Sequence, residues 1–350
     1  MPPEQWLLTR VRLAASEASD KVKQFAFETL ADVPDDEFVE IREGFVRVGV
    51  WSLQNSLPIF KAIQRGKLFT ILVGMRPAST FHLGHLTLMR ELCWLVERGG
   101  QPVFLFASYE AGKFVSTRDA ELEMALFGET YLKFTGTLLP ETAVSFSDRE
   151  CQDLQTLEDR VAECLTVRKV LQLYGWDESV SVATLRIPAI TAAVFLFPAI
   201  RFLESPTLVL SDIHQITHAE ATKIVARQLK MPPPSYSYRM LLPSLEGPAQ
   251  RMSVKNPKSV ILLDDAREQI ATKLQRSFSG GRLTPEEQRT NGGNPHCCSF
   301  FKIAEVLQPR DETTQMHREC VSGASLCGEC KQKHIPTLVE KIHALSSTET

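Results

Sequence analysis

The sequence has little net charge. Its 350 residues include 39 Lys and Arg and 42 Asp and Glu, so the formal net charge is −3. A chain so close to neutrality carries no global basic field that would attract a polyanion, but the sum does not exclude a local basic patch. Internal repeats and low-complexity segments are also missing, so repeat architectures are not indicated. The remaining composition is typical of a globular protein, and the length predicts two domains.

Long hydrophobic runs and targeting segments are scarce as well. The longest apolar stretch, residues 187–200, is broken by Pro188 and Pro198 and is expected to be too short to span a bilayer. The first residues lack the charged start and apolar core of a secretory signal. Acidic residues early in the chain argue against a mitochondrial transit peptide. We therefore expect a cytoplasmic protein without a membrane partner.

An N-terminal extension precedes the regular part of the sequence. Residues 1–30 have the amphipathic pattern of one helix. Residues 38–52 alternate between apolar and polar and carry β-branched side chains, which predicts a β-hairpin. We expect these helical and hairpin elements to make up an extension over residues 1–60.

Alternating strands and helices predict an α/β domain over residues 61–264. Continuous apolar runs of strand length suit parallel strands that are buried on both faces. A strand–helix–strand unit implies a parallel sheet with right-handed crossovers. Later helix-start signals, such as Thr284 followed by Pro285, predict a helical domain over residues 265–350. The strands are expected at 68–73, 102–107 and 206–211, and the helices at 86–96 and 217–229.

The segment His82-Leu83-Gly84-His85 directly follows the first predicted strand. In an open α/β sheet, ligands bind beyond the carboxyl ends of the strands. A helix that begins there offers free N–H donors and partial positive charge to a phosphate. His82 and His85 would share one helical face, and Gly84 would leave room for a flat base. The alternative is a pair of polar histidines on a surface helix, but the strand–turn–helix context favours a nucleotide site.

A second candidate motif, Arg251-Met252-Ser253-Val254-Lys255, lies in a polar loop far along the chain. Two cations and a hydroxyl on a mobile loop can clamp a triphosphate. A basic loop on its own is more often a solvated surface segment. The motif therefore gains weight only in combination with the first.

Together the two motifs resemble the HIGH and KMSKS signatures of class I aminoacyl-tRNA synthetases. Over residues 38–345 the chain also resembles tryptophanyl-tRNA synthetases of the archaeal and eukaryotic type. This resemblance implies a Rossmann-like catalytic domain, a helical C-terminal domain that binds the anticodon, and a homodimer. It further implies tryptophan, ATP and tRNA(Trp) as substrates. The segments that carry it are 174–176, 188–190, 278–282, 285–289, 292–295, 320–323 and 327–331.

The resemblance also implies roles for individual residues. His82 and His85 would contact the phosphates of ATP, and Gly84 would lie under the adenine. Arg251, Ser253 and Lys255 would hold the departing pyrophosphate together with Mg²⁺. Glu110 would lie near the indole, although an exposed loop acid is an equally good interpretation. The remaining expected positions are Gly74, Gln215 and Met252 for ATP, and Glu110, Thr191 and Gln215 for the amino acid.

Several positions depart from the family pattern. Arg251 and Lys255 stand where the family has Lys and Ser, and an Arg lacks the compact geometry of an ammonium group. Thr191 replaces a Gln, His214 an Asp and Ser108 another Asp. These changes affect substrate recognition more than ATP handling. They leave open a divergent paralogue with altered amino acid specificity or no aminoacylation activity, which would act as a nucleotide- or tRNA-binding regulatory protein.

Cysteine is distributed unevenly, because five of the eight lie between Cys297 and Cys330. Cys297, Cys320, Cys327 and Cys330 are separated by 22, 6 and 2 residues, a set that suits Zn²⁺ or an iron–sulfur cluster. Free thiols without metal are the third interpretation. Some tryptophanyl-tRNA synthetases have similar spacing and carry a [4Fe–4S] cluster, so the resemblance implies that cofactor, with Zn²⁺ as the alternative.

Overall fold

The computed structural model describes residues 38–75, 81–111, 115–202 and 205–346, without the side chains of residues 110 and 111. The helix expected over residues 1–30 lies outside them. The described elements are α3 (Val39–Arg47), β1 (Val50–Gln54), α4 (Leu57–Gln64), β2 (Phe69–Met75), α5 (Gly84–Val96), β3 (Gly100–Phe106), α6 (Ser108–Ala111), α7 (Thr117–Thr135), β4 (Val144–Ser147), α8 (Gln152–Glu163), α9 (Val167–Tyr174), α10 (Val182–Arg201), β5 (Thr207–Ser211), η1 (Ile213–Gln215), α11 (Ile216–Leu229), β6 (Ser235–Arg239), β7 (Pro243–Ser244), β8 (Gly247–Arg251), η2 (Pro257–Ser259), α12 (Arg267–Arg276), α13 (Pro285–Asn291), α14 (Ser299–Leu307), α15 (Arg310–Val321) and α16 (Cys327–His343).

Within the described residues, one six-stranded sheet has the spatial order β1-β6-β5-β2-β3-β4. β2 pairs in parallel with β3 on one side and with β5 on the other. The parallel ladder continues from β3 to β4 and from β5 to β6, while β1 runs antiparallel to β6. The parallel strands therefore have the order of a Rossmann-like fold, and the strand order reverses between β2 and β5. The predicted α/β class is confirmed.

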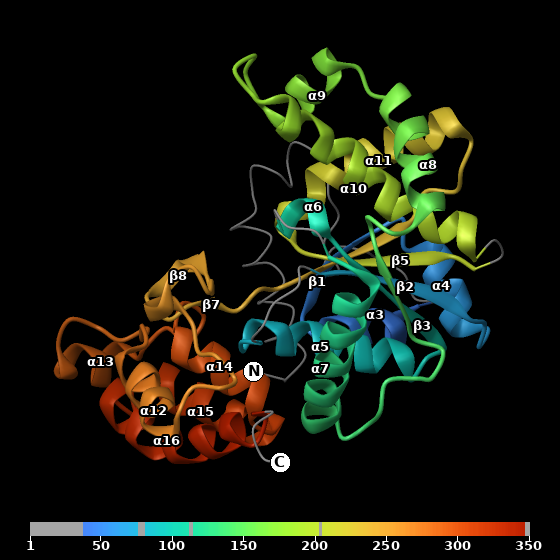
Figure 1. Ribbon diagram of the computed structural model, residues 1–350. Coiled ribbons are helices and arrows are strands. Elements are labelled where there is room, and N and C mark those ends of the chain that lie inside the picture. Colours follow the sequence, from blue (N-terminus) through green and yellow to red (C-terminus); the bar gives the residue numbers. More distant parts are fainter. Residues whose placement is uncertain (1–37, 76–80, 112–114, 203–204, 347–350) are drawn as a thin grey trace.

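Helices cover both faces of this sheet. In Figure 1, α8 to α11 lie on one side of the strands, and α3, α5 and α7 lie on the other. Nearly all residues of β2 and β3 are buried. Burial on both faces explains why these strands are continuous apolar runs in the sequence.

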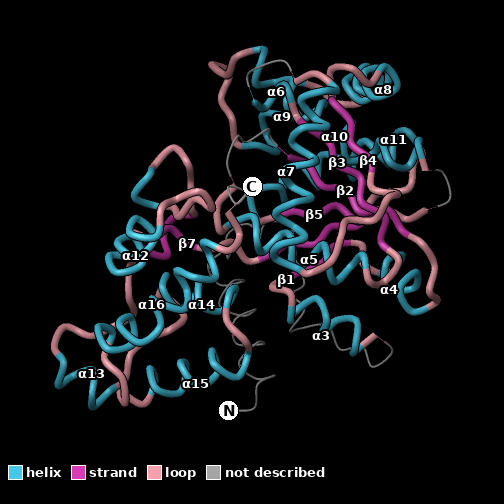
Figure 2. Tube along the Cα trace, turned by 60° about the horizontal axis from the view of Figure 1, so that its bottom comes forward, coloured by secondary structure: helices cyan, strands magenta, loops and turns pink. Residues whose placement is uncertain are grey.

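A second, helical unit contains α12 to α16 and lies apart from the sheet in both ribbon views (Figures 1 and 2). The β7–β8 hairpin is tied to it, because Ser299 Oγ donates a hydrogen bond to Ser244 O at 2.7 Å. The sheet domain contacts it through Arg90 on α5, whose guanidinium donates to the carbonyls of Glu305 and Val306. The start signal at Thr284 is confirmed, since its hydroxyl accepts from the amide of Glu287 at 3.1 Å.

The predicted hairpin over residues 38–52 is wrong. Residues 39–47 form the helix α3, and only β1 is a strand, which pairs with the distant β6. Phe38, Phe45 and Val48 are buried. These side chains are three and seven residues apart, the spacing of one face of a helix. The β-branched residues between them suggested a strand and obscured this helical spacing. A turn at Gly49, where φ is +95°, separates the two elements.

Helix α10 corrects the expectation that the longest apolar stretch is too short to span a bilayer. It has 20 residues, because the helix continues through Pro188 and Pro198. Among the described residues it is the only helix long and apolar enough to cross a membrane. However, 56% of the most apolar 18-residue stretch of this helix is buried inside the protein. The helix packs against α8, α11, β2 and β5. The core helix of a globular domain has the same properties, so the length and composition of α10 are only a weak indication of a membrane-spanning helix.

The central strand provides a test of the fold. Leu72 of β2 is fully buried, and Leu122 of α7 is 62% exposed. We expect Leu72→Ala to lower the free energy of unfolding by about 2–5 kcal/mol, because it removes apolar contacts and leaves a cavity. The matched variant Leu122→Ala should change it by less than about 0.5 kcal/mol. Urea unfolding of both variants measures the difference, and equal effects would contradict the burial of β2.

Candidate active site

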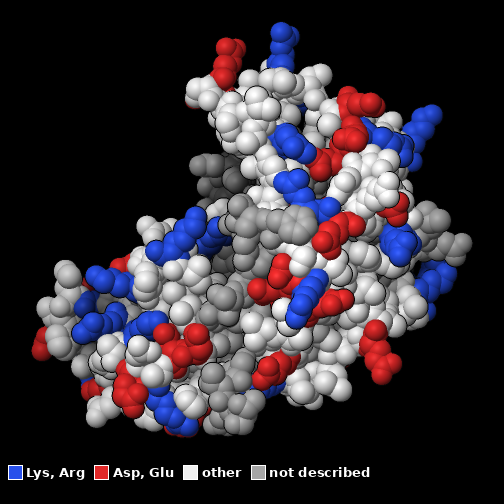
Figure 3. Space-filling model, in the orientation of Figure 1, with Lys and Arg blue, Asp and Glu red and all other residues white. Residues whose placement is uncertain are grey.

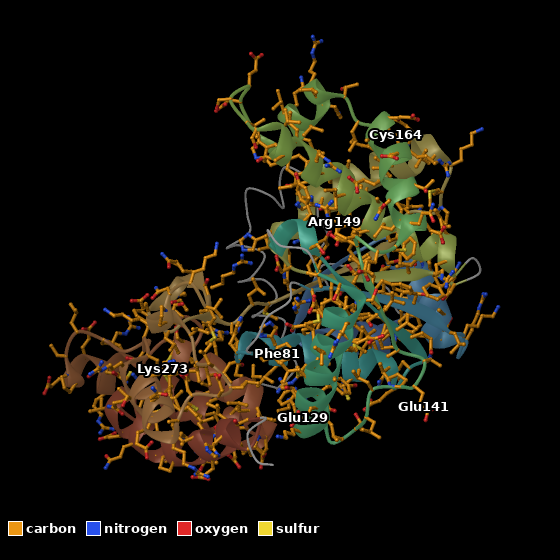
Figure 4. All side chains as sticks on the ribbon, viewed as in Figure 1. Phe81, Glu129, Glu141, Arg149, Cys164 and Lys273 are labelled. Atoms are coloured by element: carbon orange, nitrogen blue, oxygen red, sulfur yellow. The ribbon has the colours of Figure 1, made fainter. Side chains whose placement is uncertain are left out.

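The first signature lies at the start of α5, after β2. Phe81, which precedes it, lies near the boundary between the sheet and the helical unit (Figure 4). The amide of Gly84 donates to Nδ1 of His82 at 3.0 Å, so a neutral His82 keeps its Nε2–H as a donor for a ligand. A Cβ at residue 84 would lie 2.7 Å from Cε1 of His82. Glycine at this position therefore leaves room for the histidine ring as well as for a ligand.

Both signature histidines are neutral at pH 7. Burial lowers the pKa of His82 to about 4, and the positive charge of Arg251 adds to the shift. Burial likewise lowers the pKa of His85 to about 3, with further lowering by His82 and Arg239. The two rings lie together, with centroids 4.1 Å apart. They can donate hydrogen bonds to a phosphate, but the fixed positive charge must come from other residues.

The second signature supplies such charge. Arg251 ends β8, and the segment that follows its loop touches the first signature, because the amide of Leu83 donates to the carbonyl of Ile261 at 3.2 Å. Met252 is buried, while Arg251 and Lys255 are exposed. The loop is closed on itself, because the amide of Ser253 donates to Ser259 Oγ at 3.2 Å and Ser259 Oγ donates to the carbonyl of Ser253 at 3.1 Å. Two cations are thus held on a folded loop, and the charge of one of them, Arg251, acts on His82.

A cavity of about 150 Å³ lies at the carboxyl ends of the parallel strands. Its walls combine apolar side chains, such as Leu105, Val194 and Phe195, with polar ones in about equal measure. Three predicted ligand-binding residues line it: Gly74, Thr191 and Gln215. Glu110 belongs to α6, but its side chain lies outside the description. A position at the strand ends and a mixture of apolar and polar lining are the features expected of a small-molecule site.

The same cavity has polar residues that sequence reasoning missed. Asp148 follows β4 and accepts from the amides of Ser108 and Tyr109 at 3.0 and 3.3 Å. Asp212 follows β5 and accepts from the amide of His214 at 2.7 Å. Arg239 ends β6 and also lines the cavity. Each follows or ends a parallel strand, so recognising β4 and β6 would have indicated two of them.

Two larger cavities adjoin this region. One of about 380 Å³ brings Arg239 and Arg251 together with His214, Cys297 and Lys302. The other, of about 850 Å³, lies between α6, α8 and α10. Arg149, beside α6 in Figure 4, is one of its lining residues. The first of these cavities joins Arg251 of the second signature to Cys297 and Lys302 of the helical unit.

The candidate metal ligands surround the glycine-rich segments of the helical unit. A Cβ at Gly281 would lie 2.9 Å from Sγ of Cys327, and one at Gly293 would lie 2.9 Å from Sγ of Cys320. Among the described residues, however, no group of three or more His, Cys, Asp or Glu side chains is arranged to hold a metal ion. The expected metal site is therefore not shown by this geometry.

Comparisons with known proteins agree with this architecture. Residues 64–340 match the family described as "tRNA synthetases class I (W and Y)". A solved structure of tryptophanyl-tRNA synthetase from Aeropyrum pernix superposes with a TM-score of 0.76 at 24% identity, covering 94% of this chain and 92% of that one. A tyrosyl-tRNA synthetase from the same species gives a TM-score of 0.69 at 17% identity. The chain belongs to the class I tRNA synthetases of the tryptophan and tyrosine group.

The similar curated proteins are tryptophan–tRNA ligases. The ligase of Pyrobaculum aerophilum is 30% identical over 286 residues, which cover 79% of this chain and 74% of that protein. A cytoplasmic tryptophan–tRNA ligase of Bos taurus is 28% identical and is covered over 65% of its length. Within the class, the resemblance is therefore to the tryptophanyl members.

The neutral histidines predict a pH dependence of stability. Because the folded pKa values of His82 and His85 lie below the ordinary histidine value of 6.5, folding disfavours their protonation. Their stabilising contribution is present above pH 6.5 and is lost as the pH falls towards 4. We expect the free energy of unfolding to fall with pH over this range more steeply in the unaltered protein than in His85→Gln. The two slopes should differ by about 1 kcal/mol per pH unit. Urea unfolding between pH 7 and 4.5 measures this, and parallel curves would contradict it.

Proposed function

We propose that this protein is an ATP-dependent tryptophan–tRNA ligase. One observation carries the proposal: the regions of the two synthetase signatures touch, because the amide of Leu83 donates to the carbonyl of Ile261 at 3.2 Å, and a cavity lined by Thr191 and Gln215 lies at the switch point of the sheet. The family membership and the tryptophan–tRNA ligases among the relatives support it. The chain would join tryptophan to ATP as an adenylate and transfer the acyl group to tRNA(Trp).

The site suits this chemistry without a protein nucleophile. The carboxylate of tryptophan attacks the α-phosphate in line, and the bond to pyrophosphate breaks. His82 and His85 donate N–H groups to the phosphates, while Arg251, Ser253 and Lys255 hold the leaving pyrophosphate. Mg²⁺, when bound with ATP, neutralises part of the charge on the phosphates. Catalysis therefore depends on positioning and on charge stabilisation.

Further residues complete the proposed binding sites. Gly74, Gly84 and Met252 adjoin the nucleotide, Gln215 lies at its boundary with the amino acid, and Thr191 and Glu110 contact tryptophan. Gly74 supports this arrangement, because a Cβ there would meet nothing within 4 Å and would extend into open space.

We also propose the partners and the domain roles. The helical unit, residues 265–350, binds the anticodon of tRNA, the Rossmann-like domain covers 61–264, and residues 1–60 form an extension. Lys and Arg side chains grouped over the β7–β8 hairpin and the adjacent helical unit support a tRNA surface (Figure 3). The protein would act as a homodimer in the cytoplasm, as the family resemblance implies.

A divergent paralogue is the second candidate. Thr191 supports it, because this residue lines the amino acid cavity and lacks the amide that the family pattern has there. Such a protein would activate another amino acid or only bind nucleotide and tRNA.

Tryptophan-dependent ATP–pyrophosphate exchange tests the proposed function. We expect exchange by the unaltered protein and a loss of about 10²–10³-fold in kcat for Arg251→Ala and Lys255→Ala, because each removes charge from the transition state. The matched control Lys61→Ala, an exposed lysine on α4, should retain full activity. Exchange with a different amino acid, or with none, would favour the paralogue instead.

We further propose that Cys297, Cys320, Cys327 and Cys330 hold a [4Fe–4S] cluster. Burial raises the pKa of Cys330 to about 12, and Cys298, Cys320 and Cys327 add to the shift, so these thiols lie in one neighbourhood. Small residues beside the sulfur atoms leave space that a Cβ would fill. A four-iron cluster binds one thiolate per iron, and the spacing of the four cysteines, which resembles that of cluster-bearing tryptophanyl-tRNA synthetases, favours it over zinc.

Iron analysis tests the cluster independently of activity. An anaerobic preparation should be brown and contain about four irons per chain. Cys320→Ser should lose both colour and iron, while Cys164→Ser should keep them, because Cys164 lies at the far side of the sheet domain (Figure 4). A colourless protein with one zinc would contradict the proposal.

A further inference from the structure

Arg239 occupies an unusual position in the site. It ends β6 and lines both the 150 Å³ cavity and the 380 Å³ cavity that contains Arg251. Its side chain is only 14% exposed. Its charge is also close enough to lower the pKa of His85. A buried guanidinium therefore lies where the amino acid cavity meets the phosphate site.

The hydrogen-bonding groups of Arg239 are only partly used. Nη1 donates to the carbonyl of Ser211 at 3.3 Å and lies 3.8 Å from Oε2 of Glu91. Within the described structure, Nε of Arg239 is buried without a hydrogen-bond partner, and so is Oγ of Ser211. Both residues line the 150 Å³ cavity. These two atoms have no exposed surface, so a ligand in the cavity would be bound through the terminal nitrogens of Arg239, of which only Nη1 has a partner among the described residues.

Glu91 holds the guanidinium without satisfying it. This carboxylate lies on α5, is fully buried, and accepts a hydrogen bond from Ser237 Oγ. Burial raises its pKa, while Arg239 and Ser237 oppose the shift. At 3.8 Å the ion pair is too long for a direct hydrogen bond. Glu91 therefore orients Arg239 and leaves donors for a second anion.

We propose that Arg239 binds the carboxylate of the amino acid substrate at the junction of the two cavities. A planar guanidinium suits a carboxylate, which it can bind through two N–H groups. One carboxylate oxygen stays on Arg239 while the other forms its bond to the α-phosphorus, and the bond to pyrophosphate breaks with no proton transferred. This role rests on the proposed synthetase function and makes Arg239 a further catalytic residue.

Binding of tryptophan and of tryptamine, which lacks the carboxylate, tests this role. We expect Arg239→Met to weaken tryptophan binding by about 10- to 100-fold, the loss typical of a hydrogen bond between charged groups. Tryptamine should bind both proteins equally, or the variant more tightly, because it carries no anion. ATP affinity should not change. Isothermal titration measures all three ligands.

The outcomes separate this role from others. If Arg239→Met loses affinity for tryptophan and tryptamine equally, or for neither, binding of the carboxylate by Arg239 is overturned. If the variant binds ATP more weakly and tryptophan unchanged, Arg239 is assigned to the α-phosphate instead. If the unaltered protein binds no tryptophan, the proposed tryptophan–tRNA ligase function is contradicted. The assignment of the tryptophan carboxylate to Arg239 is then contradicted as well.

Matched variants control for folding, since Arg239→Met leaves Glu91 buried and unpaired. The double variant Glu91→Gln/Arg239→Met removes that charge and should show the same selective loss of tryptophan affinity. Glu91→Gln alone keeps the guanidinium but removes the charge that orients it, so tryptophan binding should weaken less than in Arg239→Met. A loss of 10-fold or more in Glu91→Gln, equal to that of Arg239→Met, would overturn direct binding by Arg239.

Discussion

The parallel pairing of β2 with β3 on one side and β5 on the other is the constraint on which the site depends. Because these strands run in the same direction, their carboxyl ends meet at one edge, and the reversal of strand order between β2 and β5 opens a crevice there. The start of α5 carries His82 and His85, η1 after β5 carries Gln215, and the end of β6 carries Arg239. Residues distant in sequence therefore share one site because the sheet aligns them.

The distribution of charge at this edge follows from burial. Burial keeps both histidines neutral, so they serve as oriented donors. The fixed positive charge comes from the β8 loop and from Arg239 at the end of β6. A whole-chain charge of −3 says nothing about this local field. The partner of a synthetase is recognised by such local surfaces, and the total charge does not exclude a polyanion.

The sequence predicted the elements that are strongly apolar and failed on those that are not. The runs at β2, β3 and β5 indicated the parallel sheet, and the two signatures indicated the nucleotide site. β4 and β6 were missed because Ser and Tyr interrupt their pattern, as in Ser235–Arg239. Asp148 and Arg239 were missed with them, since the position of each depends on its strand. The prediction of a hairpin over residues 38–52 was wrong, because the helical spacing of the apolar residues in α3 was interpreted as the alternation of a strand. The cysteine spacing predicts a cluster that the described geometry does not test.

The proposed function requires that this edge of the sheet join tryptophan to tRNA through an adenylate. Charging of a tRNA(Trp) transcript with radiolabelled tryptophan measures this reaction. We expect ATP-dependent accumulation of label on the tRNA, with none on a tRNA specific for another amino acid. An uncharged tRNA(Trp), in a preparation that binds ATP and is correctly folded, would contradict the proposed function.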